Sequence, residues 1–244
     1  QLFQGRGFTE RYVKALKDEI KMVIPLLDKN RKISQIHYGG GTPSALPVAT
    51  LKELNDLFLS EFETIDSPEI AIECHPGYLN EKYWHDLISA GFTRISLGIQ
   101  DFDYKVLKAS NRKAPLLSIE HVVEILKANH IPVNMDFIYG LPLQTVDSFR
   151  KTIEKALSMQ PERIVTFSYA HVPWVNELQK KLEDIGLPTT EEKEAMYSTT
   201  KQILSSHGYG IVGLDHFVLP SDELFVASQD GELRRNFQGY CTSR

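Results

Sequence analysis

Apolar and polar residues follow a repeating order of helix-like and strand-like segments along the chain. From Thr9 onward apolar residues recur every three or four positions, so Val13, Leu16 and Ile20 share one face of a predicted helix. An alternating apolar segment at residues 33–38 follows and predicts a β-strand. The order then repeats, with predicted strands at residues 33–38, 69–73, 94–100, 133–138, 163–169 and 211–215 and predicted helices at residues 9–27, 50–58, 80–90, 119–128, 145–159 and 189–206.

Capping residues mark the starts of three of these helices. Thr50 with Glu53, and Thr189 with Glu192, have the spacing of a capping box, in which each side chain accepts from the other residue's backbone N–H group. Asn80 is a suitable N-cap for the helix between the second and third strands. These signals separate the helices from the strands before them.

The alternation of strands and helices predicts an α/β fold with a parallel sheet, and the strands have the apolar character of strands buried on both faces. A parallel barrel and an open doubly wound sheet both satisfy this order. A barrel brings the carboxyl ends of all its strands to one mouth, whereas a doubly wound sheet gathers functional residues at one switch point. We favour a barrel that forms a single domain over residues 1–244, because polar residues follow nearly every strand: residues 39–42, Glu73, Gln100, Asp136, residues 169–171, Asp215 and His216.

Three consecutive glycines, at residues 39–41, follow the first predicted strand and precede Thr42 and Pro43. Glycine allows positive φ and lets backbone groups approach a ligand closely. Proline fixes the direction in which the chain leaves the loop. The sequence therefore predicts a ligand-binding loop here, and a tight strand-to-helix connection is the alternative.

Composition narrows the class of partner. The formal net charge is -5 and the chain has no run of Lys or Arg, which argues against a nucleic-acid surface or a polybasic membrane patch. No apolar segment reaches the length of a membrane span. The two cysteines, Cys74 and Cys241, cannot form a disulfide framework. We expect a cytoplasmic protein that binds a small molecule.

Several motifs, in chain order, are similar to those of one enzyme family. They lie at residues 38–43, 72–73, 97–102, 111–112, 136–142 and 144–145. These motifs resemble the radical S-adenosylmethionine enzymes of the oxygen-independent coproporphyrinogen III oxidase group. Residues 169–173, 215–217 and 235–240 resemble the oxidases themselves. The resemblance covers nearly the whole chain.

The resemblance implies a partial parallel (β/α) barrel of the radical S-adenosylmethionine type, with about six strands. It implies the anaerobic oxidative decarboxylation of coproporphyrinogen III to protoporphyrinogen IX in haem biosynthesis, through a 5′-deoxyadenosyl radical. S-adenosylmethionine and a [4Fe-4S] cluster would be the cofactors. A tetracarboxylate porphyrinogen would be the substrate, and an electron donor protein or another reductant would be the partner.

One element of the family pattern is missing. Such enzymes bind the cluster through a CxxxCxxC loop after the first strand of the barrel, because three thiolates hold three irons. This sequence has no such loop, and we assign Cys74 and Cys241 structural roles. We therefore expect a fragment without the first strand, the cluster loop and the C-terminal region of the family, and we expect it to be inactive alone.

The resemblance also implies roles for individual residues. Backbone groups of the glycine loop and Glu73 would bind the methionine ammonium, and Arg112 would bind the carboxylate through a bidentate contact. Gln100 and Asp136 would bind the ribose hydroxyls. Ile138, Phe167 and Ala170 would flank the adenine. The expected cofactor site is therefore Gly40, Gly41, Thr42, Glu73, Gln100, Arg112, Asp136, Ile138, Phe167 and Ala170.

Each of these assignments has a structural alternative. Glu73 could form a surface ion pair, Arg112 could be a solvated loop charge, and Asp136 could cap the following loop. The apolar members could simply pack in the barrel core. Four further residues have no firm role: Arg234 and Arg235 are candidates for substrate carboxylates, and His171 and His216 lie at strand ends as candidates for contacts with substrate or a second cofactor molecule.

Two other functions were considered. A haem-binding chaperone of the same superfamily would share the barrel and the glycine loop, but residues 215–217 and 235–240 resemble the oxidase branch. A barrel aldolase or isomerase would need a strand-end lysine or carboxylate pair and a phosphate-binding loop, and neither pattern is present. The chaperone remains the alternative.

Overall fold

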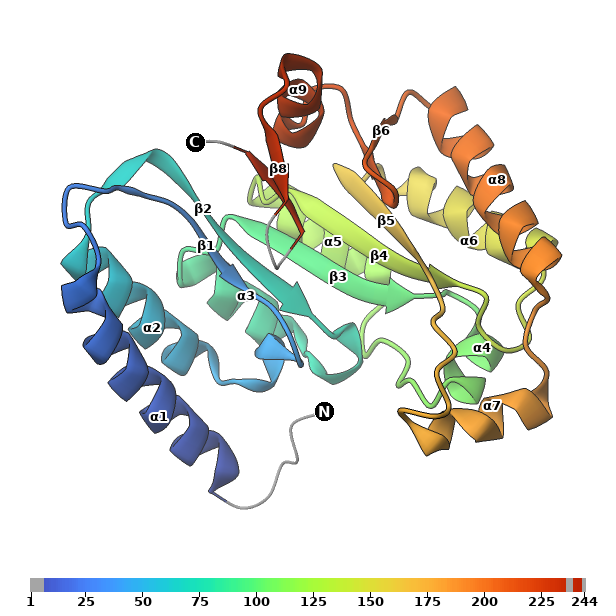
Figure 1. The fold of residues 1–244 in the computed structure, drawn as a ribbon, viewed down its shortest axis with the longest axis horizontal. Coiled ribbons are helices and arrows are strands. Elements are labelled where there is room, and N and C mark those ends of the chain that lie inside the picture. Colours follow the sequence, from blue (N-terminus) through green and yellow to red (C-terminus); the bar gives the residue numbers. More distant parts are fainter. Residues whose placement is uncertain (1–6, 236–238, 243–244) are drawn as a thin grey trace.

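A seven-stranded sheet curls into an open half-barrel, as the computed structural model shows for residues 7–235 and 239–242 (Figure 1). Its strand order is β1-β2-β3-β4-β5-β7-β6, and each pair from β1 to β5 is parallel. Five consecutive parallel strands confirm the predicted α/β class and place their carboxyl ends on one edge. The strands are β1 Ile33–Tyr38, β2 Thr64–Cys74, β3 Arg94–Gln100, β4 Val133–Tyr139, β5 Arg163–Ser168, β6 Gly210–Val212 and β7 His216–Val218.

Helices connect the parallel strands and cover the convex side of the sheet (Figure 1). Those near the predicted positions are α1 Phe8–Val23, α2 Val48–Glu61, α3 Glu81–Ser89, α5 Ile119–Ala128, α6 Val146–Ser158 and α8 Thr190–Ser206. Further elements are α4 Tyr104–Ala109, α7 Lys180–Ile185, α9 Glu223–Asp230, a hairpin of β8 Leu233–Arg235 and β9 Tyr240–Thr242, and the short 3₁₀ helices Ile24–Leu26, Pro43–Ala45, Pro76–Tyr78 and Glu177–Gln179. No helix in the described ranges combines the length and apolar character needed to cross a membrane.

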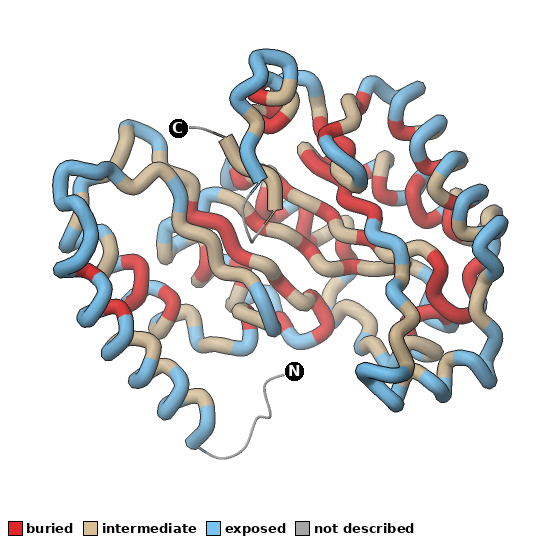
Figure 2. Tube along the Cα trace, in the orientation of Figure 1, coloured by how far each residue is buried: buried red, intermediate tan, exposed pale blue. Residues whose placement is uncertain are grey.

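Burial on both faces, which the sequence predicted for the strands, occurs in parts of β2 and β5 but not in β3 and β4. In β3 the residues Ile95, Leu97 and Ile99 are buried, whereas the alternate positions, such as Ser96 and Gly98, are only partly covered. The helices exclude water from the convex face, whereas several inner positions of the described strands stay partly exposed. Figure 2 shows buried positions along the central strands and on the helix sides that face them.

The core lies between the convex face and the helices. Its largest side chains are fully buried aromatic groups contributed by helices, strands and loops, and they are Trp84, Phe92, Phe137, Phe149 and Phe217. Apolar burial of this kind is the main favourable contribution to folding. The core therefore holds the strands rigidly while leaving their inner side chains free for function.

The last predicted strand, residues 211–215, is correct only at its start: residues 211–212 lie in β6, residues 213–215 form a turn, and β7 begins at His216. Gly213 makes the turn with a φ of +63°, and a β-carbon there would overlap the ring of Tyr240. β7 pairs antiparallel with β5, with His216 opposite Val165. His216 therefore begins an antiparallel strand beside Val165, in the middle of β5, and Asp215 directly precedes it. Neither residue lies at the end of a parallel strand.

The capping predictions have different outcomes. Asn80 caps α3 by accepting from the Tyr83 backbone N–H group, and Thr189 with Glu192 forms a complete capping box at α8. The capping box at Thr50 is wrong, because Pro47 precedes the first residue of α2 and Thr50 already lies in its first turn. The Pro47 carbonyl accepts from the backbone N–H groups of Thr50 and Leu51 at 3.0 and 3.2 Å, and no side chain caps this helix.

Candidate functional site

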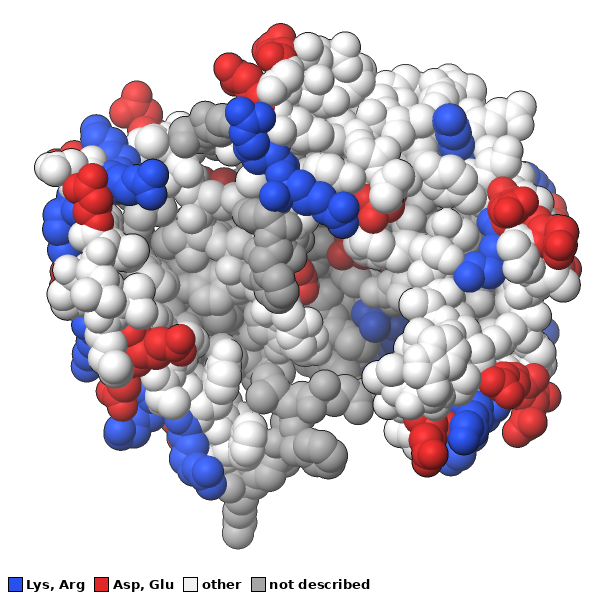
Figure 3. Space-filling model, in the orientation of Figure 1, with Lys and Arg blue, Asp and Glu red and all other residues white. Residues whose placement is uncertain are grey.

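The concave face of the half-barrel encloses a cavity of about 540 Å³, which we call the concave cavity. Inner side chains of β1 to β5 and the loops at their carboxyl ends line it, and Figure 3 shows this face hollowed between its rims. Ala170 is the one expected cofactor residue that does not line it. The other nine do, namely Gly40, Gly41, Thr42, Glu73, Gln100, Arg112, Asp136, Ile138 and Phe167.

The glycine loop forms one wall of the concave cavity. Gly40 has a φ of +103°, which a residue with a β-carbon rarely adopts. The Thr42 hydroxyl donates to the Gly41 carbonyl at 2.8 Å, and the Ser44 hydroxyl accepts from the His75 backbone N–H group at 3.1 Å. The second of these bonds ties the loop to the end of β2, so the loop has a fixed position beside Glu73.

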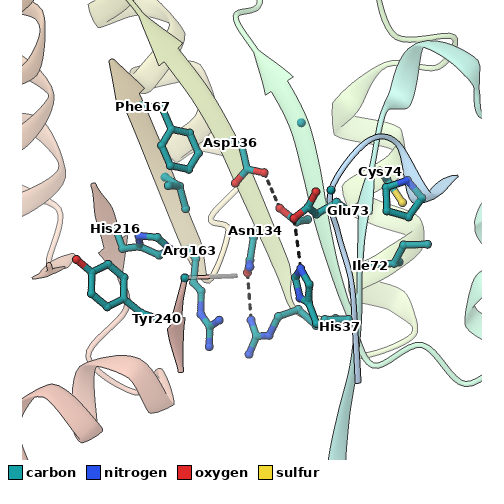
Figure 4. Close-up of a pocket in the computed structure, with 18 of the residues that line it drawn as sticks. His37, Ile72, Glu73, Cys74, Asn134, Asp136, Arg163, Phe167, His216 and Tyr240 are labelled. Carbon is teal, nitrogen blue, oxygen red and sulfur yellow. Dashed lines mark hydrogen bonds and ion pairs between the residues drawn. The ribbon is translucent and has the colours of Figure 1, made fainter. Parts of the chain in front are cut away.

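Glu73 points into the concave cavity from the end of β2. Its carboxylate lies 3.3 Å from Nε2 of His37, which extends from the inner face of β1 (Figure 4). The partner of Glu73 is thus a neighbouring inner side chain rather than a residue of the outer surface. Glu73 keeps a partly exposed carboxylate that can accept from a ligand.

Arg112 reaches the concave cavity from the loop after α4. Its guanidinium donates to the Gly98 carbonyl, and a β-carbon on Gly98 would lie 3.0 Å from Nη2 of Arg112. Burial lowers the pKa of Arg112, while the charge of Asp136 acts in the opposite direction. The geometry places Arg112 in the cavity wall and excludes the solvated loop charge that the sequence left open.

Gln100 has a strained backbone and an unused acceptor. Its φ is +71°, and a bulge shifts the register of β3 against β4 between Gly98 and Gln100. Its buried Oε1 atom accepts no hydrogen bond within the described residues. An acceptor without a partner is costly unless a ligand satisfies it, so Gln100 fits a ligand that donates.

Asp136 lies opposite Gly98 in the register of β3 and β4. The Ser96 hydroxyl donates to its carboxylate at 2.7 Å. Burial, followed by the charge of Glu73, raises the pKa of Asp136 to about 6, although the hydrogen bond from Ser96 lowers it. The two acidic groups face each other across the cavity (Figure 4), where ligand donors can bind both.

The apolar side of the concave cavity comes from β4 and β5. Ile138 and Phe167 line it, and Phe167 remains 43% exposed although it is a large aromatic residue. An exposed aromatic face beside polar acceptors suits a flat ring. Ala170 is exposed in the segment after β5, where its carbonyl faces Gln179 at 3.4 Å.

The four residues without a firm role separate into two pairs. His216 and Arg235 line the concave cavity, and the ring of Tyr240 lies between them, 5.1 Å from the His216 ring and 5.4 Å from the Arg235 guanidinium carbon. His171 pairs with Glu183 at 2.6 Å, and Arg234 donates to the Gly231 carbonyl at 3.3 Å. Neither His171 nor Arg234 lines the cavity.

Sequence reasoning missed several lining residues. Ser96 alternates with buried residues in β3, so the period of two would have identified it, whereas His37 lies in β1, where every residue is at least partly exposed. His75 follows the end of β2, and burial, with the charge of Arg112, lowers its pKa to about 4. A neutral His75 accepts from the Gly77 backbone N–H group at 3.0 Å. Tyr240 ends the motif at residues 235–240, but its contacts depend on the fold of the hairpin, so the motif gave it no role.

Charged residues form the floor of the concave cavity at the amino ends of the strands. Arg94 pairs with Glu69 at 2.6 Å and donates to Asn134 at 3.1 Å, and Arg163 pairs with Asp222 at 2.7 Å. Burial alone would raise the pKa of Glu69, but Arg94 lowers it below its ordinary value. These arginines are therefore neutralised by the protein, and the floor joins the sheet to α9.

Metal-binding side chains do not gather at one site in the described part of the chain. It contains no group of three His, Cys, Asp or Glu residues arranged to hold a metal ion. Cys74 is buried, and burial raises the pKa of its thiol. Cys241 is half-buried in β9 and lines the concave cavity. Both cysteines are free, so neither forms the disulfide of a secreted scaffold.

Curated proteins with similar sequences are oxygen-independent coproporphyrinogen III oxidases. The protein from Synechocystis is 41% identical over 240 residues, which cover 98% of this chain and 52% of the relative. The protein from Escherichia coli strain K12 is 38% identical over 237 residues, covering 96% of this chain and 51% of the relative. The chain thus spans about half the length of the curated relatives it matches.

A solved structure and a family model agree with this similarity. The structure is the coproporphyrinogen III oxidase of Escherichia coli, described as a radical SAM enzyme, with a TM-score of 0.91 and 36% identity. That match covers 98% of this chain and 55% of the solved chain. The model of the radical SAM superfamily matches residues 4–156, which include β1 to β4 and most of the cavity wall. The chain therefore belongs to the radical SAM superfamily.

Proposed function

We propose that the concave cavity binds S-adenosylmethionine, and that the protein converts coproporphyrinogen III to protoporphyrinogen IX without oxygen. The convergence of Glu73, Gln100, Arg112 and Asp136 in one cavity is the observation that carries this proposal. The names of the relatives support the reaction. Family members use S-adenosylmethionine with a [4Fe-4S] cluster, so the fit of this chain to each can be considered separately.

The donors and acceptors of the concave cavity match those of S-adenosylmethionine. In the proposed complex Glu73 and the carbonyls of the glycine loop accept from the methionine ammonium. Arg112 donates to the methionine carboxylate through its planar fork. This arrangement pairs the ammonium and the carboxylate of the methionine part with opposite charges of the protein.

The nucleoside half has its own proposed contacts. Gln100 and Asp136 accept from the ribose hydroxyls, which would satisfy the unused Oε1 atom of Gln100. Ile138 and Phe167 lie against the adenine. We leave Ala170 out of the proposed site, because its exposed position lies outside the cavity lining.

The cluster does not fit the residues of this chain. Three thiolates are needed to hold it, and the chain contains two cysteines, of which Cys74 is buried. We propose that residues outside this chain supply the cluster ligands and that residues 1–244 alone have no turnover. When S-adenosylmethionine is bound and reduced by one electron, it would supply a radical that removes hydrogen from a propionate side chain.

The chain's own residues bind and orient the reactants. The wall of Glu73, Arg112 and Asp136 would hold the nucleoside in one position, and the buried convex face keeps water from one side of the site. Arg235 lines the cavity and forms no ion pair among the described residues, so it is available to a substrate carboxylate. Figure 3 shows basic side chains over β8 beside the hollow.

The proposal also concerns cellular setting and partners. We place the reaction in the cytoplasm, which the two free cysteines support, and we propose a protein or small reductant as the electron donor. The alternative, a haem chaperone, would bind haem tightly and would not form vinyl groups.

Two experiments test the proposed function. In equilibrium dialysis the purified chain is expected to bind S-adenosylmethionine, and Glu73→Gln is expected to weaken binding about tenfold or more through loss of a charged acceptor. The full-length protein, assayed anaerobically with reductant and S-adenosylmethionine, is expected to form vinyl groups. Tight stoichiometric haem binding without turnover would instead favour the chaperone, and absence of cofactor binding by the chain would contradict the proposed site.

A further inference from the structure

A buried carboxylate lies just behind the strained residue of the concave cavity. Asp101 follows Gln100 directly, is 1% exposed, and does not line the cavity. The Thr152 hydroxyl of α6 donates to Asp101 Oδ1 at 2.6 Å, and the Gln144 amide donates to Asp101 Oδ2 at 2.6 Å. The Asp103 backbone N–H group donates to Oδ1 at 2.9 Å. Two other segments of the protein therefore hold the residue after Gln100.

Gln144 extends the same cluster to the end of the neighbouring strand. Its amide also donates to the Ile138 carbonyl at 2.9 Å, and its Oε1 accepts from the Leu141 backbone N–H group at 2.8 Å. Gln144 is 4% exposed and, like Asp101, does not touch the cavity. One side chain thus joins the end of β3 to the end of β4.

The strain at Gln100 requires such a support. A residue with a β-carbon in the left-handed region is strained and persists only where the surroundings fix it. The bulge before Gln100 also removes regular pairing with β4 at this point. The hydrogen bonds to Asp101 come from groups that cannot shift easily, because Thr152 lies on a packed helix and is 3% exposed.

We propose that Asp101, Gln144 and Thr152 are positioning residues, which set the orientation of Gln100 and Ile138 toward S-adenosylmethionine without contacting it. The inference rests on the proposed function, because it assigns these residues to the same cofactor site. A purely structural cluster would contribute to stability alone. A positioning cluster must also change cofactor affinity in protein that remains folded.

Thr152→Val is the most informative variant, because it removes one donor and preserves side-chain shape. Thr200→Val is its matched control: Thr200 is also buried, at 1% exposed, but its hydroxyl donates to the Met196 carbonyl within α8. Thr152→Ser retains the hydroxyl that Thr152→Val removes. Each protein is measured for S-adenosylmethionine affinity by equilibrium dialysis and for stability by urea unfolding.

We expect Thr152→Val to bind about tenfold more weakly than the wild type, with Thr152→Ser recovering most of the affinity and Thr200→Val unchanged. Hydrogen exchange should be faster at the Asp103 and Leu141 amides, which this cluster holds. Wild-type affinity in Thr152→Val, or an equal loss in Thr200→Val, would overturn the positioning role and leave the proposed function intact. A wild-type chain that does not bind S-adenosylmethionine would overturn both.

Discussion

The guanidinium of Arg112 donates to the backbone carbonyl of Gly98, so an arginine from a loop lies directly over a strand residue without a side chain. Gly98 is also opposite Asp136 in the register of β3 and β4. Because glycine has no side chain, the centre of the concave cavity stays open between the Asp136 carboxylate and the Arg112 guanidinium. The positions of these candidate ligand contacts therefore depend on the absence of a β-carbon at Gly98.

Gly98→Ala is expected to weaken S-adenosylmethionine binding about tenfold. The new β-carbon would lie 3.0 Å from Nη2 of Arg112 and 3.1 Å from Nε2 of Gln100, so both side chains would have to move. Isothermal titration calorimetry measures the change. Gly231→Ala is the control, because Gly231 ends α9 with a φ of +74° and open space around it. That control should lose stability and keep its affinity; an unaffected Gly98→Ala would contradict the prediction.

Asp136→Asn is expected to make the protein more stable at pH 7 and to bind the cofactor less well. Burial raises the pKa of Asp136 to about 6, so the folded state holds this proton more tightly than the unfolded state. The contribution of Asp136 to stability is therefore most favourable below its unfolded pKa, declines as pH rises through about 6, and is constant above. Removing the charge should add about 1–2 kcal/mol to the free energy of unfolding at pH 7.

Urea unfolding at pH 4 and pH 7 measures this effect. The gain from Asp136→Asn should be smaller at pH 4. Asp147→Asn should have the opposite effect, a loss of stability that is larger at pH 7 than at pH 4. The reason is that hydrogen bonds from Lys151 and Arg150 lower the pKa of the exposed Asp147 to about 2. Equal gains at both pH values in Asp136→Asn would show that its carboxyl has an ordinary pKa.

Gln100→Gly is expected to separate stability from binding. Glycine adopts the φ of +71° without strain, which offsets the entropy that it adds to the unfolded chain. The free energy of unfolding should therefore change by less than about 1 kcal/mol, whereas cofactor affinity should fall because an acceptor is lost. Thermal unfolding with and without S-adenosylmethionine tests both parts. A large loss of stability in the absence of cofactor would show that the Gln100 side chain has a structural role.

Asp222→Asn is expected to cost about 3 kcal/mol of stability. Asp222 pairs with Arg163 at 2.7 Å with both side chains almost fully buried, and Arg94 lies 3.9 Å from the same carboxylate. Removing its charge leaves two buried guanidinium groups less well compensated, while asparagine retains the N-cap of α9. Asp18→Asn removes an exposed pair with Lys14 and should have no measurable effect in the same urea titration. Similar small effects in both variants would contradict the importance of the charged floor.

Much of the fold could be predicted because local signals and tertiary structure agree. The strand Arg94–Gln100 and the helix Ile119–Ala128 have the predicted bounds. One difference is at Gly213, where a turn ends the predicted strand of residues 211–215 after Val212. Short helices such as α7 lack enough residues for a periodic signal, and their formation depends on tertiary contacts.

The site was predictable where it depends on strand ends. Parallel strands bring Glu73, Gln100 and Asp136 together wherever their side chains point inward, so position in the sequence was sufficient. Ser96 and His37 were missed because the strands were expected to be buried on both faces. Asp101 and Gln144 lie in the motifs at residues 97–102 and 144–145, but their mutual hydrogen bond could not be predicted, since it joins residues 43 apart in sequence.

A crystal structure of the protein with S-adenosylmethionine tests the central claim most directly. We expect the methionine ammonium to lie within hydrogen-bond distance of Glu73, the carboxylate at Arg112, and the ribose at Gln100 and Asp136. A cofactor bound elsewhere, or a concave cavity that stays empty at saturating S-adenosylmethionine, would contradict the account.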